Sequence, residues 1–235
     1  MKDKPMTVEA VIFDMDGTLV DTNRAHVEAW WRAFERCGFS VPVAHIAREI
    51  GKGGDMLVPA VLGEAVDKEH GDALREYNGQ EFLQIAAYER FAVFPEVSQL
   101  MQTLRERGLK VALATSAKKE FLEAIEKSAE VDIQSMVDLV VTANDAQRSK
   151  PAPDLIEATI TKLDIDAAQC VMVGDTPHDA EACKRAGVVC FGVLTGGHTR
   201  ETLLNAGAQA VWNDVADLLA HLDDALELVA LSATH

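Results

Sequence analysis

The sequence contains no apolar run long enough to cross a bilayer. Its first residues, MKDKPMTVEA, lead directly into a strand-like segment and lack the apolar region of a signal peptide. We therefore expect a cytoplasmic protein without a membrane partner. Cysteine is also scarce, since there are only four and none forms a CxxC pair. This pattern argues against a zinc site and against a framework of disulfide bonds.

Positive charge is the second shortage. Lysine and arginine number 22 against 38 aspartates and glutamates, and the formal net charge is −16. Proteins that bind nucleic acids depend on clustered basic side chains, so we expect no nucleic-acid partner. The same charge repels a phosphorylated substrate at long range. A site for such a substrate would need a local set of backbone amides, a lysine and a metal ion.

Two carboxylates mark the most informative segment, VIFDMDGTLVDT at residues 11–22. Its continuous apolar start is typical of a strand covered on both faces in a parallel sheet, and such strands present ligand sites at their carboxyl ends. Asp14 and Asp16 then come one residue apart. They repel each other unless a cation lies between them or one takes up a proton, so they indicate a hard metal ion. A calcium loop is excluded, because Leu19 and Ala25 occupy the positions that need glycine and glutamate.

Apolar periodicity along the rest of the chain predicts an α/β fold. Helical spacing appears first, at about 27–37, 55–62 and 74–88, with no strand between these segments. From Phe94 onward, helices alternate with short apolar strands, which is typical of a parallel sheet. Strands are expected at 111–114, 139–141, 170–173, 188–193 and 210–212, and helices at 96–107, 118–129, 155–163, 179–186, 200–206 and 215–231. An all-helical insert of about 70 residues thus follows the first strand, where it could act as a lid.

Two later segments suit a phosphate site. Thr115 and Ser116 follow the strand at 111–114, where a hydroxyl and a backbone amide could bind phosphoryl oxygens. The same residue types also cap helices, and both roles can coexist. Lys150 opens the loop KPAPD, whose two prolines stiffen the backbone around it.

Two more acids, Asp175 and Asp179, follow the strand at 170–173. Asp175 is expected to reach a metal ion held by Asp14. Asp179 is expected to support the ligands from behind, or to favour the dipole of the next helix from its first turn. Oxygen ligands of this kind suit magnesium.

In chain order, these segments resemble the signatures of the haloacid dehalogenase superfamily. They are DMDGTLVD from Asp14, Thr115 at a strand end, Lys150 in KPAPD, and GDTPHD from Gly174. The resemblance is to the phosphatases with a helical cap inserted after the first strand, and it covers nearly the whole chain. It implies a Rossmann-like parallel sheet sandwiched by helices, formed by residues 1–21 and 92–235, with an all-helical cap at residues 22–91.

The resemblance also implies a chemistry. Asp14 would attack phosphorus to form an aspartyl phosphate, and Asp16 would serve as general acid and then as general base. Mg²⁺ would be held by Asp14, the backbone carbonyl of Asp16, and Asp175. Lys150 would join the metal ion in offsetting the negative charge of the phosphate.

Asp16 also separates the branches of this superfamily. Members that release halide lack an acid at that position, and so do phosphonate hydrolases that use a cap lysine. Lys52 is therefore expected to be a substrate contact in the cap loop or a solvated side chain. Together with Arg48 and Asp55, it is a candidate for setting substrate selectivity.

The favoured function is Mg²⁺-dependent hydrolysis of a small phosphorylated metabolite, such as phosphoglycolate or a sugar phosphate, by a monomer or homodimer. An isomerase of the beta-phosphoglucomutase type shares the cap and all four signatures. It differs in keeping water away from the aspartyl phosphate, and no residue of the sequence distinguishes the two. A noncatalytic binding protein is the third alternative, which is disfavoured because every expected catalytic residue is present.

Overall fold

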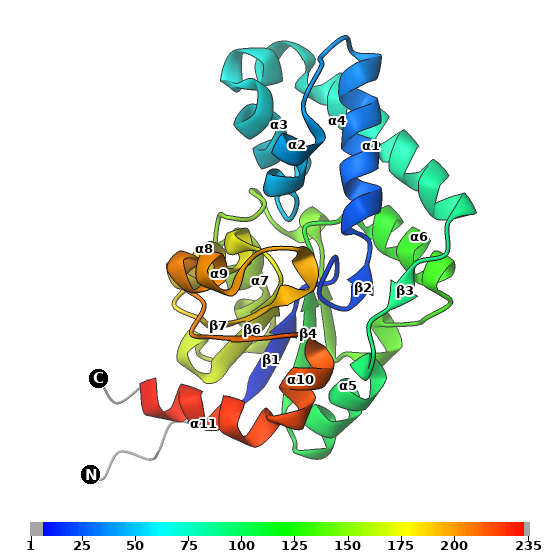
Figure 1. Ribbon diagram of the computed structural model, residues 1–235. Helices are drawn as coiled ribbons and strands as arrows, with labels where there is room; N and C mark the ends of the chain where they lie inside the picture. The colour runs from blue at the N-terminus through cyan, green and yellow to red at the C-terminus, as the bar shows by residue number, and fades with distance from the viewer. Residues whose placement is uncertain (1–6, 233–235) are drawn as a thin grey trace.

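A six-stranded parallel sheet forms the centre of the protein (Figure 1). The computed structural model describes residues 7–232. In spatial order the strands are β5 (Leu139–Val141), β4 (Lys110–Ala114), β1 (Ala10–Phe13), β6 (Cys170–Gly174), β7 (Val189–Val193) and β8 (Ala210–Trp212). β1 is paired on both sides, with Ile12 beside Ala112 and Met172. The predicted α/β fold is therefore confirmed, and the apolar sequence of β1 reflects its burial at the centre of the sheet.

Helices cover both faces of the sheet. Alternate side chains of β1 point to opposite faces, so that Val11 belongs to one hydrophobic core and Ile12 to the other. The first face is covered by α5 (Val97–Glu106), α6 (Lys119–Ala129), α10 (Val215–Ala220) and α11 (Leu222–Ser232), and the second by α7 (Asp154–Leu163), α8 (Pro177–Ala186) and α9 (Arg200–Ala206). Four short 3-10 helices lie in the connections: η1 (Gln134–Met136), η2 (Ala143–Asp145), η3 (Ala167–Gln169) and η4 (Leu194–Gly196). The helical segment expected at 215–231, either continuous or broken, is two helices separated by His221.

A further group of helices lies above the carboxyl ends of the strands in Figure 1. These are α1 (Asn23–Arg36), α2 (Val43–Glu49), α3 (Gly54–Leu62) and α4 (Glu64–Tyr88), which follow one another between two short antiparallel strands, β2 (Val20–Asp21) and β3 (Ala92–Val93). The helices share a core of their own, in which Trp30, Phe34 and Leu74 are buried. The predicted division, with a cap at residues 22–91, agrees with this packing and stays a prediction.

The helical insert differs from the sequence-based expectation in two respects. α2 was not predicted, because a seven-residue helix is too short to show a clear apolar stripe. α4 begins at Glu64, well before the expected start at residue 74. Its first turns read EAVDKEHGDA, a largely polar stretch whose helix is set by packing against its neighbours. Between residues 7 and 232, no helix combines the length and the apolar character that a membrane span requires.

Candidate active site

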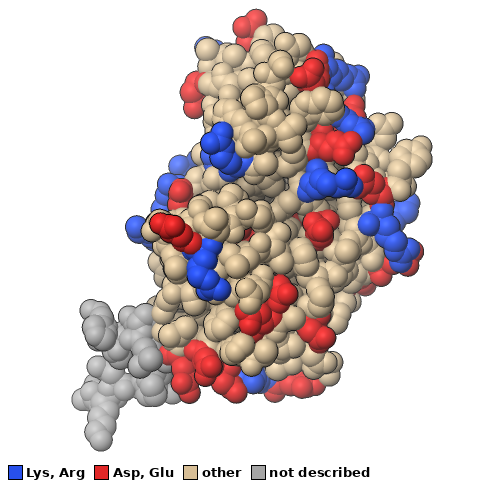
Figure 2. Space-filling view, viewed as in Figure 1, with Lys and Arg blue, Asp and Glu red and all other residues tan. Residues whose placement is uncertain are grey.

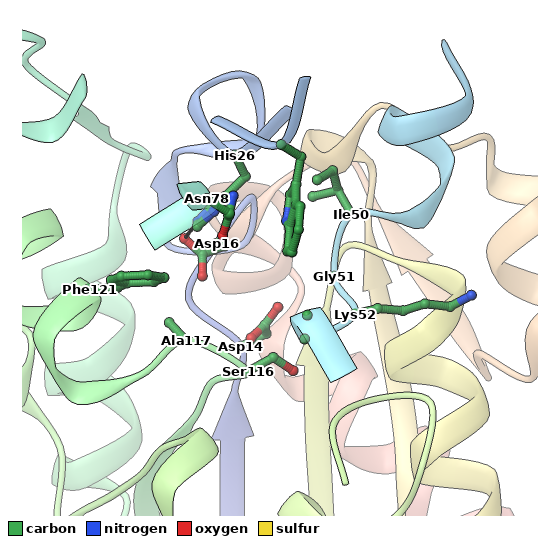
Figure 3. A pocket seen from close by; sticks show the side chains of 13 residues that line it. Asp14, Asp16, His26, Ile50, Gly51, Lys52, Asn78, Ser116, Ala117 and Phe121 are labelled. Atoms are coloured by element: carbon green, nitrogen blue, oxygen red, sulfur yellow. Dashed lines mark hydrogen bonds and ion pairs between the residues drawn. The ribbon is translucent and has the colours of Figure 1, made fainter. Parts of the chain in front are cut away.

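Three strands end at one edge of the sheet, where the predicted site residues lie. Asp14 follows β1, Thr115 follows β4 and Asp175 follows β6. The backbone of Asp14 still belongs to the sheet, since its amide donates to the carbonyl of Val173 over 2.9 Å. Figure 3 shows Asp14 at the tip of β1, facing a pocket. The structure thus brings together three residues that lie far apart in the sequence.

Lys150 is a fully buried cation beside Asp14. Its ammonium nitrogen lies 2.7 Å from Oδ1 of Asp14 and 2.7 Å from Oδ1 of Asp179, and none of its surface is exposed. Burial by itself lowers the pKa of Lys150, but the charges of Asp14 and Asp179 raise it above its usual value. The lysine is therefore cationic at neutral pH. The sequence could not show that this side chain points inward from its loop.

Three buried carboxylates cluster at this place, and two of them, Asp14 and Asp179, contact Lys150. Oxygen atoms of Asp14, Asp175 and Asp179 all lie within 4.8 Å of one another. Burial raises the pKa of Asp14 to about 7, although Lys150 acts in the opposite direction. Burial, followed by the charges of Asp179 and Asp14, raises the pKa of Asp175 well above its usual value. The cluster has an excess of negative charge and offers only hard oxygen donors, so it fits a cation such as Mg²⁺.

Asp179 has its carboxylate occupied by protein groups. Oδ1 accepts from Lys150, while Oδ2 accepts from the backbone amide of Thr176 over 3.0 Å and from its hydroxyl over 2.6 Å. Thr176 and Asp179 together form the capping box of α8. The local sequence TPHD therefore folds so that one acid both begins the helix and orients the lysine. This geometry suits the supporting role predicted for Asp179.

The carboxylate of Asp175 is packed so closely that two of its neighbours have no room for a side chain. Thr18 donates its hydroxyl to Oδ1 over 3.1 Å, and Asn23 donates its amide to Oδ2 over 2.8 Å. A β-carbon on Gly17 would lie 2.2 Å from Oδ2, and one on Gly196 would lie 2.1 Å from the same oxygen. Glycine at these two positions therefore keeps space for the carboxylate. Asn23, the first residue of α1, is a contact that the sequence analysis missed.

The side chain of Asp16 turns away from this cluster toward α1. Its Oδ1 accepts from the hydroxyl of Thr22 over 2.6 Å and lies 2.9 Å from Nε2 of His26. Burial raises the pKa of Asp16, but the charge of His26 and the hydrogen bonds of His26 and Thr22 outweigh it and lower the pKa below its usual value. His26 is itself stacked on Phe82, with ring centroids 4.1 Å apart. Oδ2 of Asp16 makes no hydrogen bond to any described residue, and Asp16 lines the pocket.

His26 was not found from the sequence. The available signal was weak, because a histidine four residues after Thr22 on an amphipathic helix is equally compatible with a surface position. Only the path of the chain from β2 into α1 brings its ring over Asp16.

Thr115 and Ser116 lie at the end of β4, as expected, and do not cap the next helix. α6 begins after Lys118, and no side chain caps it, so the capping alternative is wrong for both residues. The hydroxyl of Thr115 accepts from the amide of Ala117 over 3.0 Å. The hydroxyl of Ser116 is buried, lines the pocket and has no hydrogen-bond partner among the described residues. Ser116 is therefore a free donor close to Asp14 (Figure 3).

The pocket beside Asp14 has a cavity volume of about 70 Å³. It is bounded on the sheet side by Asp14, Asp16, Ser116, Ala117 and Phe121, and on the side of the inserted helices by His26, Trp30, Ile50, Gly51, Lys52, Gly53, Gly54 and Asn78. It is small compared with the several hundred Å³ of a site for a drug-sized ligand. The inserted helices and their connections supply most of the residues that line it.

Lys52 lies at the edge of this pocket. Its ammonium group is ion-paired with Glu49, and Figure 3 shows the side chain directed away from Asp14. Arg48 and Asp55, the other two candidates for selectivity, are not among the residues that line the pocket. Asp55 instead accepts from the backbone amide of Ser149 over 2.9 Å, which links α3 to the loop that carries Lys150. The structure thus gathers Asp14, Asp16 and Ser116 around the pocket, with Lys150 beside Asp14. Lys52 lines the same pocket, but its ammonium group is paired with Glu49.

Comparison with known proteins identifies a family whose model spans the residues of this site. The family model described as haloacid dehalogenase-like hydrolase matches residues 11–193, which include all four signature segments. The chain belongs to this family. Its inserted helices and its relatives place it in the helical-cap phosphatase branch of the haloacid dehalogenase-like hydrolases.

Individual relatives of this haloacid dehalogenase-like hydrolase cover nearly the whole chain. It is 32% identical over 222 residues to a probable phosphatase, IndB, of Dickeya dadantii, with 93% of this chain and 95% of the relative covered. It is 31% identical to a phosphoglycolate phosphatase of Rhodospirillum rubrum, with 89% of each chain covered. Among solved structures, a hydrolase from Pseudomonas syringae has a TM-score of 0.84 at 31% identity and covers 92% of this chain and 98% of its own.

Proposed function

We propose that this enzyme is a Mg²⁺-dependent phosphatase that hydrolyses a small phosphorylated metabolite through an aspartyl phosphate on Asp14. The observation that carries the proposal is the position of Asp14 at the base of the pocket, 2.7 Å from the buried ammonium of Lys150. Lys150 contacts Oδ1, which leaves Oδ2 of Asp14 as the oxygen for attack on phosphorus. Several relatives, including the two described above, are named as phosphatases.

The charge of the site supports a metal requirement. Asp14, Asp175 and the backbone carbonyl of Asp16 would hold Mg²⁺, as the donor set and its excess negative charge suggest. When bound, Mg²⁺ offsets the charge of the phosphate and of the attacking carboxylate. The protein as a whole has a net charge of −16. On the face seen in Figure 2, acidic side chains gather over the lower part of the molecule, whereas basic and acidic side chains are mixed around its middle. Beside Asp14 itself, the counter-charge supplied by the protein is that of Lys150.

The remaining side chains have separate tasks. Ser116 offers an unpartnered hydroxyl for a phosphoryl oxygen. Lys150 balances negative charge beside Asp14, and Asp179 holds the lysine in place. Asp16 is held as an anion by Thr22 and His26, and the anion is the form that takes a proton from the attacking water. The proton that Asp16 takes from the attacking water is the one that it donates to the leaving oxygen of the next substrate, so the proton transfers of one cycle balance.

The test is phosphate release from a panel of phosphorylated metabolites, measured with Mg²⁺ and with excess chelator. We expect metal-dependent release that Asp14→Asn abolishes, because an amide cannot attack phosphorus. Release that persists in Asp14→Asn would contradict the assigned nucleophile, and release in chelator would contradict the metal. If the panel gives no release, interconversion of β-glucose 1-phosphate and glucose 6-phosphate would favour the isomerase. The predicted monomer or homodimer and the cytoplasmic location stay predictions.

A further inference from the structure

Among the described residues, two side chains of the pocket have a buried polar atom without a hydrogen-bond partner: Ser116, described above, and Asn78. Asn78 belongs to α4 and is 5% exposed, and its amide nitrogen Nδ2 has no hydrogen-bond partner among the described residues. Asn78 lines the pocket, and Figure 3 shows it together with Asp16 and His26 on one side of the cavity. A buried donor without an acceptor destabilises a fold, so such a group in a binding pocket calls for an explanation.

The position of Asn78 on α4 makes its polarity unexpected. The buried residues of α4 are Gly71, Leu74, Asn78, Phe82, Ile85 and Ala86, so Asn78 occupies one step of an otherwise apolar stripe. A leucine at this step would extend the core of the inserted helices. The neighbouring Gly79 lies against Phe121 of α6, since a β-carbon there would be 3.4 Å from the aromatic ring. Asn78 therefore lies where the inserted helices approach the sheet domain, at the wall of the pocket.

The charge of the pocket limits what this amide can bind. Lys52 is the one lysine or arginine among the described residues that line the pocket, and it is ion-paired with Glu49 and directed away. His26 is engaged with Asp16, and Lys150 is buried behind Asp14. A second negative group on the substrate would thus lie near the carboxylate of Asp16 without a free cation to balance it. A neutral oxygen, by contrast, needs only a hydrogen-bond donor.

We propose that Asn78 selects the substrate by donating its amide to a neutral hydroxyl or carbonyl oxygen on the leaving group of the phosphate ester. The substrate class is then a polyol or sugar phosphate rather than a phosphorylated carboxylic acid. Trp30, Ile50 and Phe121 supply apolar walls for the carbon skeleton beside this oxygen. The inference rests on the proposed phosphatase activity and adds how the leaving group, the alcohol part of the phosphate ester, is recognised.

The test compares three esters of similar size: ethyl phosphate, 2-hydroxyethyl phosphate and 2-phosphoglycolate. The first has no oxygen for Asn78, the second has a neutral oxygen, and the third has a carboxylate. For the unmodified protein, kcat/KM should be highest for 2-hydroxyethyl phosphate. In Asn78→Ala, kcat/KM for this ester should fall about tenfold, as expected for one lost hydrogen bond in a buried site, while ethyl phosphate is hydrolysed as before. The intrinsic reactivity of each ester cancels in this comparison, because kcat/KM for the same ester is compared between the variant and the unmodified protein.

Two further variants sharpen the result. Asn78→Asp keeps the shape of the side chain but removes the donor, so it should lose at least as much activity toward 2-hydroxyethyl phosphate as the alanine variant. Gln80→Ala is the matched control, because it removes an exposed amide two residues away on the same helix and should change none of the three rates. Unchanged hydrolysis of ethyl phosphate shows that the variants fold.

The outcomes separate this inference from the proposed function. If the unmodified protein releases phosphate from none of the esters or metabolites, the proposed function fails and this inference fails with it. If the protein is a phosphatase but Asn78→Ala affects all three esters equally, or Asn78→Asp retains the preference, the role of Asn78 is refuted. A preference of the unmodified protein for 2-phosphoglycolate over 2-hydroxyethyl phosphate would refute the neutral substrate class.

Discussion

The substitution Asp14→Asn is expected to stabilise the metal-free protein at neutral and alkaline pH. Burial raises the pKa of Asp14 from 3.8 to about 7, with the opposing effect of Lys150 too small to prevent it. Between these two values the folded protein holds a proton that the unfolded chain has lost. The free energy of unfolding therefore falls as the pH rises from about 4 to about 7, and it stays low above that range. Asparagine has the same shape but no charge at any pH.

The magnitude follows from the same pKa difference. A shift of about three units corresponds to about 4 kcal/mol once Asp14 is fully ionised in both states. Part of this effect is already present at pH 4.5, where the unfolded chain has begun to ionise. The advantage of Asp14→Asn over the unmodified protein should therefore grow by about 3 kcal/mol between pH 4.5 and pH 8.

The assay is urea unfolding of both proteins in excess chelator at several pH values. Asp224→Asn is a suitable control, because Asp224 is exposed and its charge is not removed from water on folding. Addition of Mg²⁺ at pH 8 should then stabilise the unmodified protein more than Asp14→Asn, since a ligand that binds only the folded state raises its stability. A stability difference that does not change with pH would refute the claim that the ionised Asp14 destabilises the metal-free fold.

Three other substitutions test the geometry. Lys150→Met removes the cation shared by Asp14 and Asp179, so unfolding in urea at pH 8 should become easier by about 3 kcal/mol, and the loss should shrink at pH 5, where protonation relieves the repulsion; an equal loss at both pH values would contradict this. Asp16→Asn should slow hydrolysis of alkyl phosphates 10²- to 10⁴-fold. The same variant should still release p-nitrophenol from p-nitrophenyl phosphate in an initial burst, because that leaving group needs no proton, and absence of a burst would argue against a general acid. Gly174→Ala would place a β-carbon 2.5 Å from Cβ of Asp179, so it should destabilise the protein by about 2 kcal/mol in thermal unfolding; an unchanged melting temperature would contradict the close packing.

The sheet could be predicted because its strands carry their own signal. Leu139–Val141 and Ala210–Trp212 have the bounds that the apolar runs predict. Asp14 and Asp175 could be identified for the same reason. Asp14 directly follows Phe13, the last residue of β1, and Asp175 directly follows Gly174, the last residue of β6. In a parallel sheet the carboxyl ends of the strands share one edge, so adjacency in space follows from position on a strand.

The inserted helices were harder to predict because their residues are placed by contacts with other elements. α2 and the first turns of α4 have no regular apolar stripe, and their helices are completed by packing. The sequence left Lys52 open between a substrate contact and a solvated lysine. The structure places it in the lining of the pocket and pairs its ammonium group with Glu49, one turn earlier in the chain, so its contact with substrate stays a prediction. Nothing in the sequence distinguishes Asn78 from a surface residue, since an asparagine in a helix is usually exposed.

The sequence by itself determined the α/β class, the alternation of strands and helices that forms the parallel sheet, and the residue types that can perform phosphoryl transfer. These properties depend on local apolar patterns and on motifs in which neighbouring residues act together. Only the tertiary structure decided which charges are paired and which donors are left free. It buried Lys150 between Asp14 and Asp179, turned Asp16 toward His26, and left the amide of Asn78 without a partner in the pocket. Such relations depend on distances between segments far apart in the chain, and these distances are fixed only when the helices pack against the sheet.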